Sequence, residues 1–189
     1  PEHLRDQLRQ AMDPLPSWYS PYSEDGYKVH ALTQRPMDMY HSWGSQNAWL
    51  RQIRGRNYLY VPTRIWVSEG FREGDYARVT STNGEIVVPV AHMAALNENT
   101  VWTWNAIGKR KAAWALDEGA SEATTGFLLN HLISELRPGP GRVANSDPVT
   151  GQAAWFDLRV KIERVGPRDR AEPAFPPVSR PVPQGWERA

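Results

Sequence analysis

Two runs rich in β-branched residues, 76–81 and 85–90, constrain the fold of this chain more than any other feature. They are joined by residues 82–84, Thr-Asn-Gly, and preceded by the Gly-Asp pair at 74–75. Asn and Gly tolerate the positive φ angles that tight hairpin turns need, and Gly-Asp is typical of a turn into a strand. The segment is therefore predicted to be an antiparallel hairpin.

Other strand patterns flank the predicted hairpin. Residues 100–104 and 156–162 alternate with period two, which is typical of strands with one buried face. Residues 58–61 form a short β-rich run, and a first strand is expected between Tyr27 and Pro36, because proline cannot donate to a strand ladder. The apolar face of 156–162 consists of Phe156, Leu158, Val160 and Ile162. These patterns predict a mainly β fold with a few short helices, a closed or nearly closed barrel of about six or seven short strands.

Helices and domain boundaries follow from spacing and composition. Residues 3–12 are predicted to form a short helix, and the apolar spacing of residues 121–136 predicts a second, although one internal glycine weakens that pattern. Residues 1–26 turn rich in Pro and Ser after the short helix and are interpreted as a connector. One domain is expected over residues 27–165, followed by a Pro-rich tail at 166–189 that cannot form a packed core.

The composition removes several kinds of chemistry. The chain has no cysteine, which excludes disulfides, thiolate nucleophiles and iron–sulfur ligation by this segment. Its five histidines show no metal-ligand spacing, and the sequence has no phosphate-binding loop and no nucleophile elbow. We therefore expect no metal ligated by this segment and no catalysis by it in isolation.

Charge and hydropathy limit the classes of partner expected for this chain. The net charge of +1 provides no overall field for nucleic acid, so no nucleic-acid partner is expected. No run of about 18 apolar residues is present, which predicts a soluble domain without direct membrane insertion. The start at Pro1, without an initiator methionine, indicates a fragment or a processed chain.

Two groups of residues leave alternatives open. The nine tryptophans are compatible with a stacking platform for bases or sugars, or with a β core or domain interface that uses their large apolar area. The basic clusters at 51–56 and 109–111 are compatible with phosphate binding or with a solvated face.

Polar side chains gather at residues 33–36 and 40–50, where the first predicted strand ends. Ser, Gln, Asn, His and Arg supply many donors and acceptors there, which suits a large, polar, heterocyclic ligand. The alternative is a loop whose side chains cap its own backbone.

At these residues the sequence resembles the dinucleotide-binding domain that ends the catalytic subunits of the dimethyl sulfoxide reductase family of molybdenum enzymes. The resemblance covers residues 27–165 and depends on the order and spacing of several short elements. They are Thr33-Gln34-Arg35, His41-Ser42 with Gln46-Asn47, the 74–90 hairpin, Asn130-His131-Leu132-Ile133, Asp147-Pro148, Thr150-Gly151 and Val160-Lys161-Ile162-Glu163.

The resemblance implies a double-psi β-barrel of the aspartate decarboxylase-like class that binds and orients molybdopterin guanine dinucleotide. The molybdenum cofactor, a bis(molybdopterin guanine dinucleotide), would carry the oxygen-atom or electron transfer itself. Arg35 would contact a phosphate or pterin oxygen, and His41 and Ser42 would hydrogen-bond the pterin side. The amide side chains of Gln46, Asn47 and Asn130 would contact polar edges of the cofactor. The implied cofactor-binding residues are Thr33, Gln34, Arg35, His41, Ser42, Gln46, Asn47, Asn130 and Gln152.

The resemblance also implies partners. These are the N-terminal domains of the same catalytic subunit, where an iron–sulfur cluster would lie, together with a membrane anchor and an iron–sulfur electron-transfer subunit. It favours the branch acting on sulfur compounds, such as sulfite, polysulfide or thiosulfate, in a prokaryotic cytoplasm or periplasm. Two alternatives stay open, a non-catalytic barrel module that binds nucleotides, nucleic acid or sugar, and a small free-standing barrel enzyme.

Overall fold

The computed structural model describes residues 2–12, 26–45, 47–105, 107–108, 126–133, 150–152 and 158–168. Six strands are defined in these ranges: β1 (Val29–Gln34), β2 (Leu59–Val61), β3 (Asp75–Ser81), β4 (Gly84–His92), β5 (Thr100–Trp104) and β6 (Arg159–Pro167). The helical elements are short: α1 (Glu2–Met12), α3 (His41–Gly44), α4 (Ala48–Ile53), α5 (Thr63–Ser68) and the 3-10 turn η2 (Leu129–Leu132). The prediction of a mainly β fold with a few short helices is confirmed.

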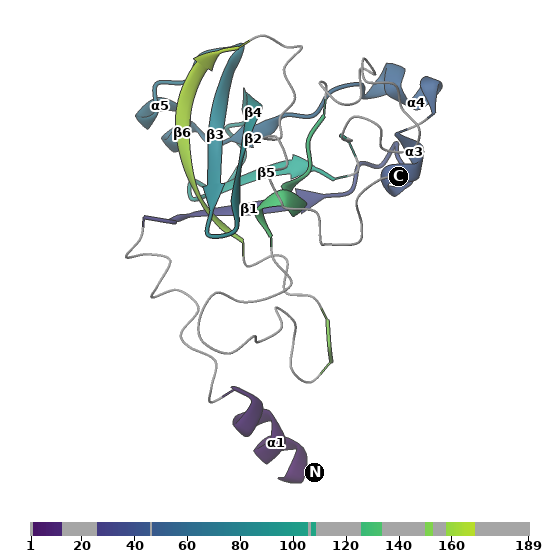
Figure 1. The fold of residues 1–189 in the computed structure, drawn as a ribbon, viewed down its shortest axis with the longest axis vertical. Helices are drawn as coiled ribbons and strands as arrows, with labels where there is room; N and C mark the ends of the chain where they lie inside the picture. The colour runs from purple at the N-terminus through teal and green to yellow at the C-terminus, as the bar shows by residue number, and fades with distance from the viewer. Residues whose placement is uncertain are drawn as a thin grey trace, which may run out of the picture.

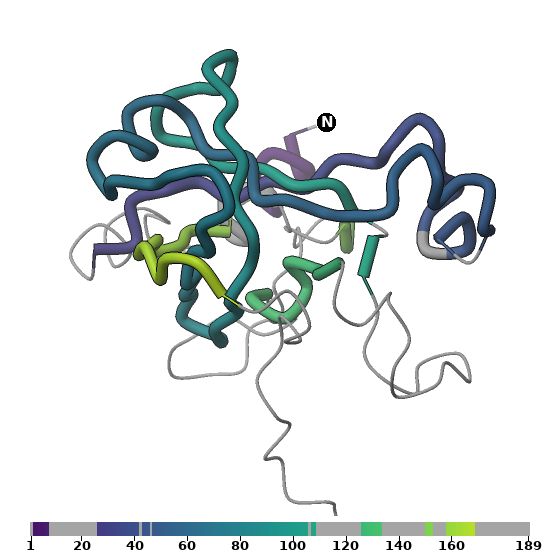
Figure 2. Tube along the Cα trace, turned by 90° about the horizontal axis from the view of Figure 1, so that it is seen from above, coloured from purple at the N-terminus to yellow at the C-terminus, as the bar shows by residue number. Residues whose placement is uncertain are grey.

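The six strands close into a barrel in the order β1-β5-β2-β4-β3-β6 (Figure 1). Two neighbouring pairs, β1 with β5 and β2 with β4, are parallel, and the remaining pairs are antiparallel. Helices α3 and α4 form an arm to one side of the barrel in both views (Figures 1 and 2). Because β1 and β5 run in the same direction, the residues that follow them leave the barrel at the same edge.

The core follows from the alternation read in the sequence. Val160, Ile162 and Leu158 are buried, as predicted for the apolar face of the last strand, and Phe156 lies outside the described residues. The predicted hairpin supplies the other wall of the core. Its buried side chains are Ala77, Val79, Ile86, Val88 and Val90. In β5 three consecutive residues are buried, so this strand is covered on both faces.

The hairpin turn forms where it was predicted, but for a different physical reason. Neither Asn83 nor Gly84 has a positive φ. Instead, the Ser81 hydroxyl accepts a hydrogen bond from the Asn83 N–H at 3.0 Å and donates to the carbonyl of Leu132 at 2.7 Å. A Cβ at Gly84 would lie 2.9 Å from the carbonyl oxygen of His131. The glycine is therefore required by the close approach of η2.

The helix predicted over 121–136 is wrong for the residues that the structure describes. Only the short 3-10 turn η2 forms, and Leu128 before it is extended. The cause is close backbone packing, because a Cβ on Gly126 would lie 2.4 Å from the Cα of Gly108. The N–H of Phe127 donates to the carbonyl of Ile107 at 2.9 Å, which holds this segment extended. Residues 121–125 and 134–136 lie outside the described ranges.

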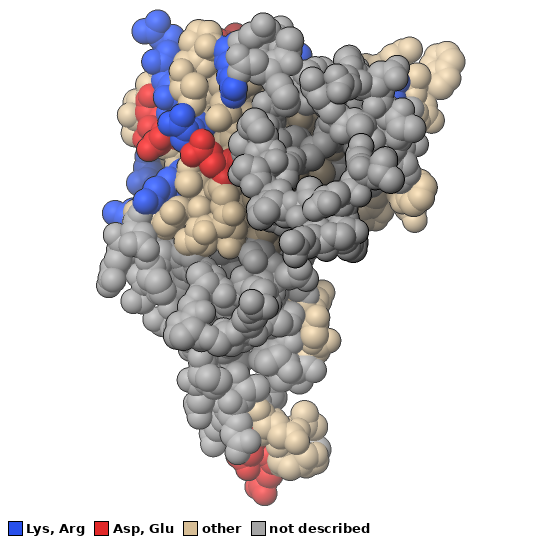
Figure 3. All heavy atoms as spheres, viewed as in Figure 1, with Lys and Arg blue, Asp and Glu red and all other residues tan. Residues whose placement is uncertain are grey.

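Charged side chains on the barrel surface are mixed in sign. Figure 3 shows basic and acidic atoms side by side on the face that carries β6 and β3. Arg78 lies 3.0 Å from Glu85 and 3.4 Å from Glu163, joining three strands by exposed ion pairs. This face therefore presents no one-sided basic surface.

In one ion pair of the barrel the acidic side chain is buried and the basic side chain is partly exposed. Asp75 is 1% exposed and accepts from the Arg164 guanidinium at 2.6 Å and from the backbone N–H of Arg72 at 2.8 Å. The hydrogen bond from Arg164 holds the pKa of Asp75 below its usual range and outweighs the opposing effect of burial. A register shift between the Tyr76 and Ala77 pairs accompanies this contact, as expected where a bulge redirects side chains.

Candidate functional site

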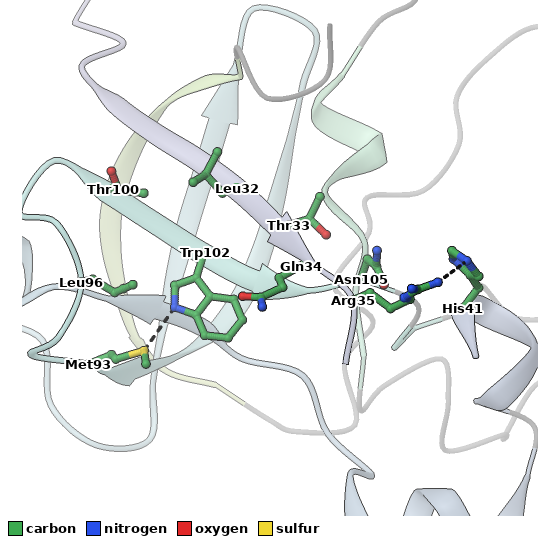
Figure 4. Close-up of a pocket in the computed structure, with 10 residues that line it drawn as sticks. All are labelled: Leu32, Thr33, Gln34, Arg35, His41, Met93, Leu96, Thr100, Trp102 and Asn105. Atoms are coloured by element: carbon green, nitrogen blue, oxygen red, sulfur yellow. Dashed lines mark hydrogen bonds between the residues drawn. The ribbon is translucent and has the colours of Figure 1, made fainter. Parts of the chain in front are cut away.

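A cavity of about 720 Å³ opens at the edge where β1 and β5 end (Figure 4). Its volume lies within the roughly 300–1,000 Å³ that is typical of small-molecule sites. The lining residues are Leu32, Thr33, Gln34, Arg35, His41, Met93, Leu96, Thr100, Trp102 and Asn105. The site is therefore built from two strands, the residues after them, and the loop after β4.

The parallel register of β1 and β5 explains why these residues meet. Gln34 pairs with Trp104 at the ends of the two strands, and the N–H of Asn105 donates to the carbonyl of Gln34 at 2.8 Å. Arg35 and Asn105 are the next residues along each strand, so both arrive at the same rim. Residues 70 positions apart in the sequence thereby share one wall.

Arg35 and His41 are joined directly. A guanidinium nitrogen of Arg35 lies 3.0 Å from Nε2 of His41. Because a guanidinium can only donate, Nε2 accepts and the ring proton resides on Nδ1. His41 also has a φ of 47°, the one positive value among the described non-glycine residues. Such backbone strain is often found at ligand sites, where the surrounding structure holds it in place.

The inner end of the cavity is apolar and aromatic. The Trp102 ring is 9% exposed, stacks on Tyr60 with ring centres 4.8 Å apart, and donates from Nε1 to the Met93 sulfur at 3.1 Å. Trp104 meets Trp102 edge to face at 4.5 Å. Figure 4 shows Trp102, Leu32 and Leu96 away from Arg35 and His41. The cavity therefore has an apolar end and a polar end.

The described tryptophans of the barrel and of the arm differ in exposure. Trp102 belongs to the core, while Trp43 and Trp49 on the arm are 63% and 76% exposed. Ile53 at the end of α4 is exposed as well, as are Met37 and Tyr40 in the segment that leads into α3. A concentration of large apolar side chains on one protruding segment is typical of a surface that contacts another protein segment.

Two buried polar atoms at the end of β5 have no hydrogen-bond partner among the described residues. They are Nε1 of Trp104, a donor, and Oδ1 of Asn105, an acceptor. A buried polar atom without a partner costs about 1–3 kcal/mol, and native structures usually satisfy such atoms with protein, water or ligand. Asn105 lines the cavity, but its Oδ1 is shielded from the cavity space as well as from bulk solvent.

The backbone under this rim is tied together by Asn57, which is fully buried. Its Nδ2 donates to the carbonyls of Trp104 at 2.8 Å and Phe127 at 3.1 Å, and its Oδ1 accepts from Thr103 at 2.8 Å and from the N–H of Tyr58 at 3.1 Å. This single amide joins the end of β5 to the 126–128 segment. It therefore supports the position of Asn105 without reaching the cavity.

The structure brings together four of the residues predicted from the sequence, Thr33, Gln34, Arg35 and His41. Asn47 does not line the cavity, because its Oδ1 caps α4 by accepting from the N–H of Trp49 at 2.9 Å. The capping alternative raised for the polar loop thus applies to this residue. Asn130 and Gln152 are exposed and lie outside the cavity lining. Gln46 and the side chain of Ser42 lie outside the described part of the structure.

Sequence reasoning missed Asn105 and the aromatic end of the cavity. The signal was present for Asn105, since it directly follows a period-two strand, as Arg35 follows the first strand. That β1 and β5 pair side by side was not readable from the sequence. Trp102 and Met93 look like ordinary core residues in the sequence, and only the cavity gives them a second role.

The basic cluster at 51–56 is partly engaged in local structure. Arg51 donates to the carbonyl of Ser45 at 3.1 Å, and Arg54 pairs with Asp38 at 3.0 Å while its guanidinium lies 4.4 Å from the centre of the Trp104 ring. Of these contacts, the one between Arg54 and Trp104 joins the residue after α4 to strand β5 of the barrel. The second cluster, at 109–111, lies outside the described ranges.

A second cavity of about 650 Å³ lies beside β4 and the turn before β3. Two of its polar groups already have partners, Asp75 with Arg164, and His92, whose Nε2 lies 3.0 Å from the hydroxyl of Thr63. No predicted site residue in the described ranges lines it. The cavity at β1 and β5 is therefore the stronger candidate.

Two features are absent from the described residues. No group of three or more His, Asp or Glu side chains there is arranged to hold a metal ion. No helix in the described part of the chain is long and apolar enough to cross a membrane.

Comparison with solved structures defines the fold. The structure superimposes on acetylene hydratase from Pelobacter acetylenicus with a TM-score of 0.56, over 76% of this chain and 19% of that one. The sequence identity is 16%, so the likeness is one of fold alone. No family model matches the chain.

Comparison with curated sequences gives a much closer relative. The chain is 46% identical over 190 residues to a sulfite dehydrogenase subunit from Allochromatium vinosum. The match includes 95% of this chain but only 20% of that protein. The chain thus spans about a fifth of the length of the curated relative it matches.

Proposed function

We propose that this chain is the molybdopterin guanine dinucleotide-binding domain of a molybdenum oxidoreductase catalytic subunit that acts on a sulfur compound. The single observation that carries the proposal is the cavity at the ends of β1 and β5. There, Arg35 and His41 meet beside Thr33 and Gln34, in a chain 46% identical to a sulfite dehydrogenase subunit. Sulfite is the substrate we infer for the parent enzyme.

The fold supports this assignment. A closed ring of six strands with two parallel neighbouring pairs is compatible with the double-psi barrel expected for such a domain. The cavity also fits the chemistry of the ligand, since it joins an aromatic and apolar end to a polar end with the cationic donor Arg35. A heterocycle that carries polar groups along one edge, with phosphates beyond it, would contact both the apolar end and the polar end of the cavity.

The residues of this chain would bind and orient the cofactor, which supplies the oxygen-atom and electron transfer when bound. Arg35 would donate to a phosphate or carbonyl oxygen. Its bond to His41 fixes both side chains before the ligand arrives, which lowers the entropy lost on binding. Thr33 and Gln34 would add hydrogen bonds at the rim. Ser42, Gln46, Asn47, Asn130 and Gln152 stay predictions as cofactor contacts.

The remaining parts of the enzyme are inferred from the same assignment. The N-terminal domains of the catalytic subunit would cover the opposite side of the cofactor and hold an iron–sulfur cluster. A membrane anchor and an iron–sulfur electron-transfer subunit would complete the assembly. The exposed apolar side chains of the arm, Trp43 and Trp49 among them, supply a surface suited to contact such domains.

The proposal is tested by titrating the 189-residue chain with GDP, which carries the guanosine diphosphate half of the dinucleotide. Trp102 lines the cavity, so tryptophan fluorescence reports occupancy, and thermal unfolding reports stabilisation. A ligand at about 100 times its Kd stabilises the folded state by about 2.7 kcal/mol. We expect saturable binding that Arg35→Ala weakens and that ADP does not reproduce.

The competing function, a general barrel module for nucleic acid or sugar, predicts a different pattern. In that case an oligonucleotide or an oligosaccharide binds, and the exposed Trp43 and Trp49 carry the fluorescence change. Binding of these ligands without selectivity for GDP would overturn the cofactor proposal.

A further inference from the structure

We propose that the second cavity, beside β4, is a docking groove for a proline-rich segment and that its occupant is residues 173–178 of this chain. The sequence of that segment is Pro-Ala-Phe-Pro-Pro-Val, within the Pro-rich tail. Residues 169–189 lie outside the described ranges, so the groove itself carries the structural evidence. It shares no lining residue with the candidate cofactor site, so the inference is independent of the proposed function.

The groove is lined by aromatic rings from three separate elements. Tyr58 precedes β2, Trp66 lies on α5 and Tyr76 lies on β3, and Pro89 of β4 adds a further flat apolar surface. Grooves lined by aromatic side chains are the surfaces on which polyproline II segments dock, since flat rings pack well against the faces of proline. The lining of this cavity therefore fits a proline-rich occupant.

The Trp66 ring is held in place before any occupant arrives. It packs against Phe71 and His92, with ring centres 5.5 and 5.4 Å away, and Nε2 of His92 lies 3.0 Å from the hydroxyl of Thr63. A wall that is fixed in advance loses little conformational entropy when a segment binds to it.

Charged groups at the groove complement those of the tail. Arg56 is half-buried in the groove and makes no hydrogen bond or ion pair with the rest of the described chain. A guanidinium without a partner favours an acidic group in the occupant, and Glu172 directly precedes the proline-rich segment. Glu73 also lines the groove, and the tail carries Arg170 two residues before Glu172. Each charge of the groove thus has a counterpart of opposite sign close to the segment.

The tail leaves the barrel beside the groove. In the antiparallel ladder of β6 with β3, Pro167 pairs with Asp75 and Gly166 pairs with Tyr76, so β6 ends where β3 begins (Figure 1). Asp75 and Tyr76 both line the groove. Pro173 follows Pro167 by six residues. An extended segment advances about 3 Å per residue and neighbouring strands are about 4.8 Å apart, so the tail is long enough to reach the groove.

The spacing of the prolines suits a polyproline II segment with one face on the rings. Such a helix has about three residues per turn, so Pro173 and Pro176 share a face, and Phe175 and Val178 share another. Proline has no N–H and cannot donate to a strand ladder, so this segment gains little by extending the sheet. Packing against aromatic rings is the contact open to it.

The test uses disulfide formation in the 189-residue chain, which contains no cysteine of its own. Ala91→Cys places a thiol in the groove, and Ala174→Cys or Val178→Cys places one in the tail. A disulfide requires two Cα atoms about 4.4–6.8 Å apart. Ala95→Cys, combined with the same tail variants, is the matched control, because Ala95 follows the same strand and is exposed but lines neither cavity.

We expect one of the pairs with Ala91→Cys to close an intramolecular disulfide at least about 10-fold faster than its control pair, since docking raises the local thiol concentration above that of a free tether. The triple variant Pro173→Ala, Pro176→Ala, Pro177→Ala should abolish this difference. Trp66→Leu should do the same by removing one ring of the groove. The triple variant changes only the tail, so the test stays decisive even if Trp66→Leu lowers the unfolding temperature.

Three results would overturn the inference. Equal rates for the groove pairs and the control pairs would show that the tail has no preference for the groove. A fast disulfide that persists in the triple proline variant would show that tethering alone brings the two thiols together. Disulfide-linked dimers whose yield rises with protein concentration, in place of closed monomers, would assign the groove to the tail of a second copy. The GDP titration tests the other cavity, so none of these results affects the proposed function.

Discussion

Two asparagines near the end of β5 differ in how their side chains are used. Asn57 is fully buried, and both ends of its amide make hydrogen bonds to neighbouring segments. Asn105 lies a short distance along the chain from two of those partners, yet its Oδ1 has no partner among the described residues. The saturated amide of Asn57 therefore stabilises the end of β5, whereas the Asn105 oxygen carries a desolvation cost that no described group offsets.

The largest effect is expected at Asn57. Asn57→Leu leaves the carbonyls of Trp104 and Phe127 and the hydroxyl of Thr103 without their partner in the core. Each unsatisfied buried group costs about 1–3 kcal/mol, so the variant should lose at least about 3 kcal/mol of unfolding free energy. Urea denaturation measures this loss.

The comparison with Asn105 is the control for that experiment. Asn105→Leu changes the same side chain in the same region and should leave stability within about 0.5 kcal/mol of wild type or raise it. Similar losses in the two variants would show that the two amides play the same structural part, and the distinction between them would be wrong.

The second largest effect is expected at the buried ion pair of the barrel. Asp75→Asn weakens the hydrogen bonds from Arg164 and from the N–H of Arg72, which should cost about 1.5–3 kcal/mol at neutral pH. Thermal or urea unfolding at pH 7 measures the difference between this variant and wild type.

The pH dependence of that difference has a definite sign. The pKa of Asp75 is lowered in the folded state, so its contribution is complete above the unfolded value of about 3.9 and is lost as the pH falls through the folded value. The stability gap between wild type and Asp75→Asn should therefore stay constant from pH 7 to about 5 and shrink below about 4. A gap that persists unchanged to the lowest pH at which both fold would contradict this account.

Much of the barrel could be predicted from the sequence because its signals are local. The alternation around Val160 depends on residues near one another in the chain, and so does the bond from the Asn83 N–H to the Ser81 hydroxyl in the hairpin turn. Strand pairing across the barrel is not local, and neither is the approach of Gly126 to Gly108 that replaces a helix with an extended segment. The apolar spacing of 121–136 described a buried face correctly, since Phe127, Leu129 and Leu132 are buried, but not the backbone that carries it.

In the candidate site, too, the features that depend on nearby residues could be predicted and those that depend on strand pairing could not. Arg35 and His41 could be predicted because polar residues crowd after one strand, a pattern contained in about ten positions. Asn105 carried a similar local signal, a polar residue directly after a strand, but its place in the cavity wall depends on which strand lies beside β1. Asn47 resembled its neighbours in the sequence, but the start of α4 requires a side-chain acceptor for an N–H of its first turn, and that local need takes its oxygen.

The smallest effect is expected at Arg78, where the contribution of ion pairing to stability can be separated from that of burial. Arg78 has two acidic partners, Glu85 and Glu163, as Asp75 has two donors, but all three side chains of the Arg78 cluster are at least 44% exposed. Solvent screens such pairs, so Arg78→Ala should change the unfolding free energy by about 0.5 kcal/mol or less, and the change should vanish in about 1 M salt. Urea unfolding at low and high salt, with Asp75→Asn measured in parallel, checks both points. A loss at Arg78 as large as that at Asp75 would mean that pairing alone, without burial, determines which polar groups hold this barrel together.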